Sequence, residues 1–187
     1  MGNAYLKEIT VIVDDDTRLI QDVKHDTNKF SLLYDKYVDI IYKYFLSKVQ
    51  NQTIAEDLTS DLFFNVLKNI DRYKHRGQFK AWIFTIARNM FYKHLRKPSP
   101  SNFEELDNMP SPLPLPEQEV TEKQSLLRIR RAIKTQPEVD QELFRLRFVS
   151  GLKFSEIGIV IGKSETATKK HFYRLLEKIS SVVECEK

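Results

Sequence analysis

The stretch GLKFSEIGIVIGKSETATKKHFYRLLEKI, residues 151–179, decides the fold because two incompatible structures compete for it. Its Gly162-Lys163-Ser164 resembles the end of a phosphate-binding loop, which requires the pattern G-x-x-x-x-G-K-[ST]. The first glycine of that pattern would stand at position 157, where this chain has isoleucine. The apolar residues before Gly162 suit a buried helical face, so the sequence disfavours a phosphate loop.

The same residues fit a helix-turn-helix, in which two short helices are joined by a tight turn at Gly162. We expect Ser155 and Ser164 to cap the two helices. Helical spacing puts four residues on the inner face of the second helix, namely Thr168, Phe172, Leu175 and Leu176. Its outer face, together with the capping serine, forms a candidate major-groove surface: Ser164, Glu165, Thr166, Lys169, Lys170, Tyr173 and Arg174. The alternative is an ordinary helical hairpin with a solvated basic face.

Residues 72–97, RYKHRGQFKAWIFTIARNMFYKHLRK, contain eight basic residues, six aromatic residues and no acidic residue. Basic groups neutralise phosphates, and aromatic rings stack on unpaired bases. The combination suits single-stranded DNA better than duplex DNA. We expect Trp82 and Phe91 to lie in the core. The candidate DNA-binding residues are Tyr73, Lys74, His75, Arg76, Lys80, Arg88, Asn89, Tyr92, Lys93 and Arg96.

Six of the seven prolines fall within residues 98–122, a segment with six acidic residues and no basic one. Proline removes backbone donors, so this segment is predicted to be an extended acidic linker. The expected fold class is all-α, with two small helical domains on either side of the linker. The predicted division is an N-terminal extension (1–16), a first domain (17–97), the linker, a second domain (123–182) and a tail (183–187).

Apolar residues at three- and four-residue steps predict a helix from about Phe30 to Phe45, preceded by cap candidates at Asp26, Thr27 and Asn28. A second helix is predicted from near Thr53, with Glu56 completing a capping box. A third runs from about Phe79 to Lys97. Residues 5–13 are a candidate lone strand. In the second domain, helices are predicted at about 124–134 and after Pro137, the latter ending at Gly151.

Composition limits the class of protein. No apolar run approaches the roughly 20 residues of a membrane span, and the single cysteine, Cys185, cannot form an internal disulfide. A cytoplasmic location is expected. The four histidines, at positions 25, 75, 94 and 171, lack metal-ligand spacing, so neither a metal nor a cofactor nor an enzymatic activity is predicted.

Several of these segments, in this order, resemble the sigma-70 family of bacterial transcription initiation factors, specifically its short extracytoplasmic-function group. LIQDVKHDTNKFSLLYDKYVDIIYKYF is similar to the opening of sigma region two, and AEDLTSDLFFNVLKNIDRY to its polymerase-binding helix. FKAWIFTIARNMFYKHLRK is similar to the helix that reads and melts the minus-ten promoter element. LFRLRFVSGLKFSEIGIVIGKSETATKKHFYRLLEKI resembles region four, which binds the minus-thirty-five element.

The resemblance implies a sigma factor that binds the beta and beta-prime subunits of core RNA polymerase and recognises promoter DNA, both duplex and single-stranded. It assigns polymerase binding to Ala55, Glu56, Asp57, Asp61, Phe64 and Asn65, and base capture to the loop from Tyr73 to Gln78. It also implies control by an anti-sigma factor or another recruiting partner. The alternative function is a helix-turn-helix regulator that binds duplex DNA without polymerase.

Overall fold

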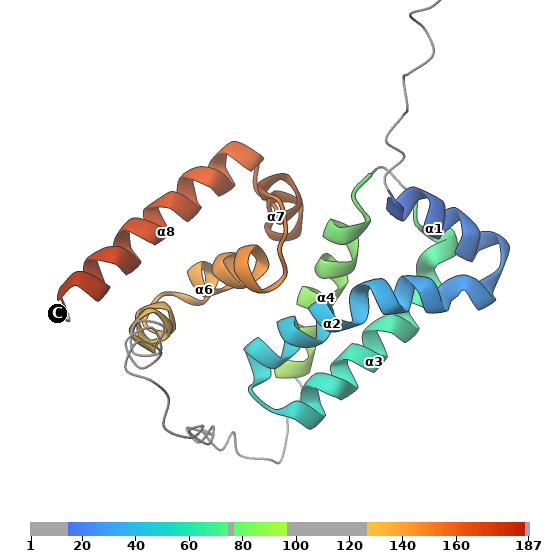
Figure 1. The fold of residues 1–187 in the computed structure, drawn as a ribbon, viewed down its shortest axis with the longest axis horizontal. Helices are drawn as coiled ribbons and strands as arrows, with labels where there is room; N and C mark the ends of the chain where they lie inside the picture. Colours follow the sequence, from blue (N-terminus) through green and yellow to red (C-terminus); the bar gives the residue numbers. More distant parts are fainter. Residues whose placement is uncertain (1–14, 75–76, 97–126, 186–187) are drawn as a thin grey trace, which may run out of the picture.

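The computed structural model describes residues 15–74, 77–96 and 127–185, and all regular structure within these ranges is helical (Figure 1). The N-terminal domain (15–96) consists of α1 (Asp15–His25), η1 (Thr27–Lys29), α2 (Phe30–Val49), α3 (Gln52–Asn69), η2 (Ile70–Arg72) and α4 (Phe79–Arg96). The C-terminal domain (127–185) has a helix at 127–134, then α6 (Glu138–Phe144), the π-helical turn η3 (Arg145–Val149), α7 (Phe154–Ile161) and α8 (Glu165–Cys185). The predicted all-α fold with two helical domains is confirmed. The linker and the candidate strand at 5–13 lie outside the described residues and stay predictions.

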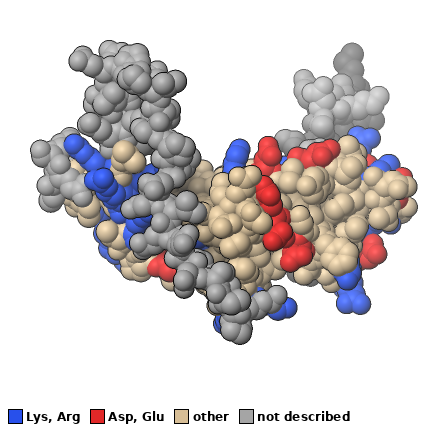
Figure 2. All heavy atoms as spheres, turned by 90° about the horizontal axis from the view of Figure 1, so that it is seen from below, with Lys and Arg blue, Asp and Glu red and all other residues tan. Residues whose placement is uncertain are grey.

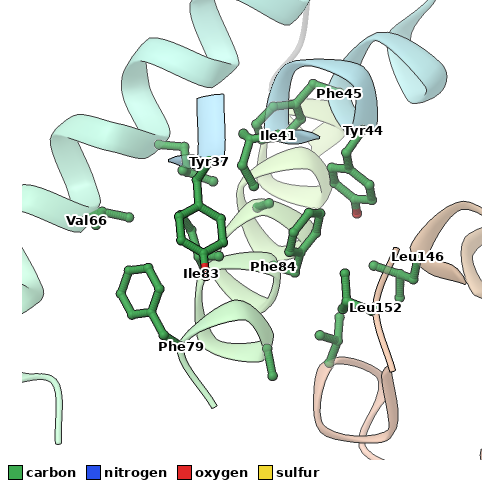
Figure 3. Packing of buried hydrophobic residues seen from close by; sticks show 14 of the residues in the cluster. Tyr37, Ile41, Tyr44, Phe45, Val66, Phe79, Ile83, Phe84, Leu146 and Leu152 are labelled. Carbon is green, nitrogen blue, oxygen red and sulfur yellow. The ribbon is translucent and has the colours of Figure 1, made fainter. Parts of the chain in front are cut away.

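The core of the N-terminal domain lies where α2 crosses α3 and α4 (Figure 3). The predicted apolar face of α2 supplies Leu33, Tyr37, Ile41 and Phe45 to this core, whereas Tyr34 remains 40% exposed beside the ring of Phe63. Burying each such large side chain stabilises the fold by about 1.5–3 kcal/mol relative to leaving it in water. Packing against α2 therefore fixes the relative positions of α3, which carries the predicted polymerase-binding residues, and α4, which carries most of the residues predicted to bind single-stranded DNA.

Two helix starts in this domain differ from the sequence prediction. α3 begins at Gln52 because Asn51 is its cap, with Oδ1 accepting a hydrogen bond from the backbone N–H of Ile54 at 3.0 Å. The predicted cap at Thr53 is therefore wrong by two residues. α1 was not predicted at all, because only Leu19, Ile20 and Val23 mark its apolar face in an otherwise polar stretch.

In the C-terminal domain, α7 and α8 form a helix-turn-helix around Gly162, which adopts φ 70° as the tight turn requires. The Lys163 N–H donates to the carbonyl of Gly158 at 2.8 Å, and Ser164 Oγ accepts from the N–H of Ala167 at 3.2 Å. The predicted turn and Ser164 cap are confirmed. These residues are helix and turn, and they do not form the phosphate loop considered above.

The predicted cap at Ser155 is wrong, because Ser155 lies inside α7. The helix starts one residue earlier, and Glu156 Oε2 accepts a hydrogen bond from the N–H of Lys153 at 2.6 Å. A carboxylate three residues into the helix thus satisfies the capping residue's own backbone donor. The hydroxyl of Ser155 is not needed there.

The two domains share one apolar core. Leu146 and Leu152 of the C-terminal domain are fully buried in the same cluster as Tyr44 of α2 and Phe84 of α4 (Figure 3). α4 packs against α7, and α2 packs against η3. The helix predicted to bind single-stranded DNA therefore lies at the boundary between the domains.

Candidate nucleic-acid and partner interfaces

α4 has one buried face and one polar face, which follow from its helical spacing. Its inner face buries Ile83, Phe84, Ala87 and Phe91, so the expected core position of Phe91 is confirmed, while Trp82 is half-buried. On the other face, Asn89, Lys93 and Arg96 are exposed. α4 contains no acidic residue. Its cations can therefore bind phosphates, and the amide of Asn89 can bind bases, without repulsion from a carboxylate on the same helix.

The segment before α4 divides into a buried and an exposed part. Tyr73 is buried, with its ring 4.6 Å from Trp82 and 5.4 Å from Phe79, so it packs in the core. Lys24 of α1 fixes this position by donating to the Tyr73 carbonyl at 2.6 Å. Lys74 is exposed. His75 and Arg76 lie outside the described residues, so their assignment stays a prediction.

Two of the residues predicted to bind DNA, Lys80 and Arg88, contact the C-terminal domain, and Tyr92 lies beside Arg88. Lys80 Nζ donates to the carbonyl of Gly151 at 3.1 Å, and burial lowers the pKa of Lys80 below its ordinary value. Arg88 lies with Nε 4.0 Å from Glu142, and its guanidinium stacks 5.0 Å from the ring centroid of Tyr92. Burial, followed by the charge of Glu142, raises the pKa of Tyr92. In this arrangement, Lys80 and Arg88 on the polar face of α4 are engaged within the protein.

The predicted major-groove face of α8 is open along its length. All seven of its residues are exposed, and they follow one another along the first turns of the helix: Ser164, Glu165, Thr166, Lys169, Lys170, Tyr173 and Arg174. Glu165 pairs with Lys169 at 2.7 Å. The inner face buries Thr168, Phe172 and Leu175 as predicted. The exposed surface thus carries hydrogen-bond donors for bases and phosphates, and packing against α7 holds the helix in place.

A shallow hollow of about 610 Å³ beside this face is lined by Lys163, Ser164, Ala167, Lys170, His171 and Arg174. Sequence reasoning missed Lys163 and His171. Lys163 follows the turn glycine, and His171 is held by Asp140 of α6, with Nε2 2.5 Å from Oδ1. The available signals were Lys163, directly after the turn glycine, and the basic run at 169–171. Lys163 extends the basic surface beyond α8 itself.

The outward face of α3 is acidic with one large apolar residue. Glu56, Asp57, Asp61 and Asn65 are exposed, and Phe64 is 59% exposed with Lys68 Nζ 4.1 Å from its ring centroid. Figure 2 shows acidic side chains gathered on the side of the N-terminal domain where α3 lies. Ala55, in contrast, is fully buried and belongs to the core of the domain. The other five predicted polymerase-binding residues are all exposed on α3.

Neither a metal centre nor a membrane helix emerges from the described ranges. No cluster of three His, Cys, Asp or Glu side chains occurs there with the geometry to hold an ion. None of the helices in these ranges combines the length and the apolar character of a membrane span.

Two models of known protein families match this chain, one in each domain. A family model described as Sigma-70 region 2 matches residues 33–99, and one described as Sigma-70, region 4 matches residues 126–179. The chain is 32% identical to the ECF RNA polymerase sigma factor BldN of Streptomyces coelicolor, covering 84% of this chain and 61% of that protein. It is 26% identical to the ECF RNA polymerase sigma factor SigE of Mycolicibacterium smegmatis, covering 76% of this chain and 56% of that protein. The chain thus spans about three-fifths of the length of these two relatives.

A shorter relative is matched over most of its length. The ECF RNA polymerase sigma factor SigW of Bacillus subtilis is 25% identical, with 84% of this chain and 90% of that protein covered. Among solved structures, CnrH in complex with the cytosolic domain of CnrY matches with a TM-score of 0.63 at 16% identity, covering 92% of this chain and 99% of that one. This last likeness concerns the fold alone.

Proposed function

We infer the function from the premise that this chain belongs to the sigma-70 family, in its extracytoplasmic-function group. We propose that it binds core RNA polymerase, recognises promoter DNA and helps to open it, acting by binding and not by catalysis. One observation carries the proposal: a single chain combines an open helix-turn-helix face on α8 with an acid-free basic helix, α4. A regulator that only binds duplex DNA would need the first feature and not the second.

The open face of α8 is assigned to duplex DNA at the upstream promoter element. Lys169, Lys170 and Arg174 are exposed, and α8 is positioned by α7 as in proteins that insert the second helix into the major groove. Lysine and arginine in this position bind guanine edges or phosphates. Lys163, which lines the hollow, is assigned to phosphates because it precedes the first turn of α8 and flanks the helix.

α4 and the preceding loop are assigned to the strand that is separated at the downstream promoter element. Melting costs about 1.4 kcal/mol per base-pair step in lost stacking. Phosphate neutralisation alone offsets little of that cost, since phosphates are present in open and closed DNA alike. Contacts from Asn89, Tyr92 and Arg88 to unpaired bases, which exist only in the open form, supply the difference.

The exposed face of α3 is assigned to the polymerase. Protein interfaces commonly combine an exposed aromatic anchor with a polar surround, and Phe64 with Glu56, Asp57, Asp61 and Asn65 has this composition. The acidic side chains call for a basic partner surface, which the beta-prime subunit would provide. The proposal places the protein in the cytoplasm, where polymerase and promoter DNA are found.

Transcription in vitro tests the proposed function. The purified chain is added to core polymerase free of sigma factors on a library of promoter fragments, and transcripts are sequenced at their 5′ ends. We expect start sites shared by a common pair of upstream elements and absent from core polymerase alone. Duplex binding by the chain without any polymerase-dependent transcript would instead support the regulator.

A further inference from the structure

A buried carboxylate connects the two domains. Glu142 of α6 is only 2% exposed, although it belongs to the C-terminal domain and its polar contacts lie on the N-terminal domain. The hydroxyl of Tyr44 donates to its Oε1 at 2.7 Å, Lys48 forms an ion pair with its Oε2, and Arg88 Nε lies 4.0 Å away. These three partners all belong to the N-terminal domain, so separation of the domains would leave the carboxylate without them.

The partner of this carboxylate is enclosed in the same way. The Lys48 side chain is fully buried, and only backbone atoms of this residue reach solvent. Its ammonium lies 4.2 Å from the ring centroid of Phe91, and it also pairs with Glu138 at 3.2 Å. A buried ammonium is strongly destabilised when its partner carboxylate is removed. The contact therefore specifies one docking geometry of the two domains.

The docked domain covers the face of α4 that the proposed function gives to single-stranded DNA. Lys80 is held by the carbonyl of Gly151, and Arg88 Nε lies 4.0 Å from Glu142 Oε1 while its guanidinium stacks on Tyr92. The apolar part of the contact brings Leu146 and Leu152 against Tyr44 and Phe84 (Figure 3). DNA and the C-terminal domain cannot occupy these side chains together.

We propose that the C-terminal domain is an autoinhibitory cover over α4, held closed by an interdomain lock of Glu142, Lys48 and Tyr44. The inference rests on the assignment of α4 to single-stranded DNA under the proposed function. The desolvation cost of a buried ion pair can match or exceed its Coulombic gain, so the pair adds little net free energy to the closed form. The lock thus fixes the closed geometry without making it irreversible, and binding of polymerase to either domain can shift the equilibrium.

A fluorescence experiment on the full chain tests the lock. The chain has one tryptophan, Trp82 on α4, and one cysteine, Cys185 at the end of α8. Energy transfer from Trp82 to a dye attached at Cys185 reports the separation of the domains without further substitutions. Glu142→Gln is compared with Glu177→Gln, which makes the same charge change at an exposed position of α8. Circular dichroism checks that both variants are folded.

We expect Glu142→Gln to lower the transfer efficiency and Glu177→Gln to leave it unchanged. Lys48→Gln should act like Glu142→Gln, and the double variant should separate the domains no further than either single variant, because both remove one contact. This non-additivity distinguishes a lock from general loosening of the fold. Unchanged transfer in folded Glu142→Gln, or additive effects, would overturn the lock.

The second arm measures affinity for a fluorescent single-stranded DNA oligonucleotide of mixed sequence by anisotropy. Opening should tighten binding by Glu142→Gln at least about fivefold over Glu177→Gln, since apparent affinity scales with the competent fraction. Lower transfer with equal affinity in the two variants would refute the cover while leaving a docked domain. Failure of the proposed function would appear separately, as absence of polymerase-dependent transcription by the parent chain.

Discussion

Replacing Gly158 by alanine should destabilise the helix-turn-helix. A Cβ at this position would lie 2.5 Å from the carbonyl oxygen of Lys163, closer than real Cβ atoms approach, and 3.4 Å from Thr168 Oγ1. The obstacle is backbone and not the end of a flexible side chain. The same carbonyl belongs to the turn that is closed by the hydrogen bond from Lys163 N–H to Gly158. The added methyl therefore separates α7 from the start of α8.

The magnitude follows from two opposing effects. Overpacking costs about 1–3 kcal/mol, and loss of the turn hydrogen bond about 1 kcal/mol. Alanine in a helix gains about 0.8–1.0 kcal/mol over glycine. The balance is a net loss of about 1–3 kcal/mol, which for a chain of this size lowers the midpoint of thermal unfolding by about 2–4 °C for each kcal/mol.

Urea and thermal unfolding of the full chain, followed by circular dichroism, measure this change. The matched control is Ser155→Ala, an exposed position in the same helix that gains alanine's helix propensity without a clash. It should be neutral or slightly stabilising, whereas removal of a true cap costs about 1 kcal/mol. A Gly158→Ala variant as stable as the parent would show that the turn is not packed as described, and the reasoning from close approach would fail.

Three further predictions concern the other surfaces. Asp57→Lys with Asp61→Lys should weaken capture of core polymerase about tenfold or more, because like charges then face the basic partner surface; a pull-down at fixed salt measures this. Lys169→Ala or Arg174→Ala should weaken promoter binding. If the lost contact is to a base, the cost is about 1–3 kcal/mol and the preference at one base pair is relaxed, whereas loss of a phosphate contact weakens binding to all sequences equally. Competition binding of the polymerase complex to different promoter sequences separates the two. Burial and Glu142 raise the pKa of Tyr44 well above its ordinary value of 10.0, so its stabilising contribution is present below pH 10.0 and declines as pH rises toward the folded value. Tyr44→Phe should flatten that alkaline decline in unfolding measurements.

Controls for these predictions come from the same chain. Glu177→Lys makes one such charge reversal at an exposed acidic position outside α3 and should leave polymerase capture unchanged. Polymerase capture by the double variant equal to that of the parent would remove α3 from the interface. Promoter affinity unaffected by both α8 substitutions would mean that another face reads the duplex. An alkaline decline in Tyr44→Phe as steep as in the parent would assign it to other groups.

Local features of the structure could be predicted from the sequence. Helical spacing located α2, α4 and α8 and separated the buried Thr168, Phe172 and Leu175 from the exposed face, because a helix repeats its contacts every three or four residues. Gly162 and Ser164 marked the turn, since few residues tolerate positive φ and few cap a helix so well. Ser155 was misleading because α7 starts before it, and Glu156, inside the helix, accepts the hydrogen bond from the backbone N–H of the capping residue Lys153.

Long-range contacts could not be predicted in this way. Tyr44 and Glu142 are 98 residues apart, and Glu142 in an acidic, amphipathic helix has the appearance of a solvated residue. Lys80, Arg88 and Tyr92 were expected to face outward from α4, but they are half-buried, and nothing in their spacing showed that a second domain lies beside Lys80 and Arg88. Ala55 fell among exposed residues in the sequence motif, yet its position on α3 turns it to the core.

Opening of promoter DNA is the central claim, and permanganate reactivity of unpaired thymines measures it most directly. Polymerase carrying the parent chain, Asn89→Ala with Lys93→Ala, or the control Lys43→Ala from the exposed surface of α2 is placed on one promoter, as duplex and as a pre-melted bubble. The account predicts that the α4 double variant leaves the duplex unreactive but transcribes from the bubble, while Lys43→Ala behaves like the parent on both. If the α4 variant opens the duplex as the parent does, α4 binds phosphate only and the strand-separating role assigned to it is contradicted.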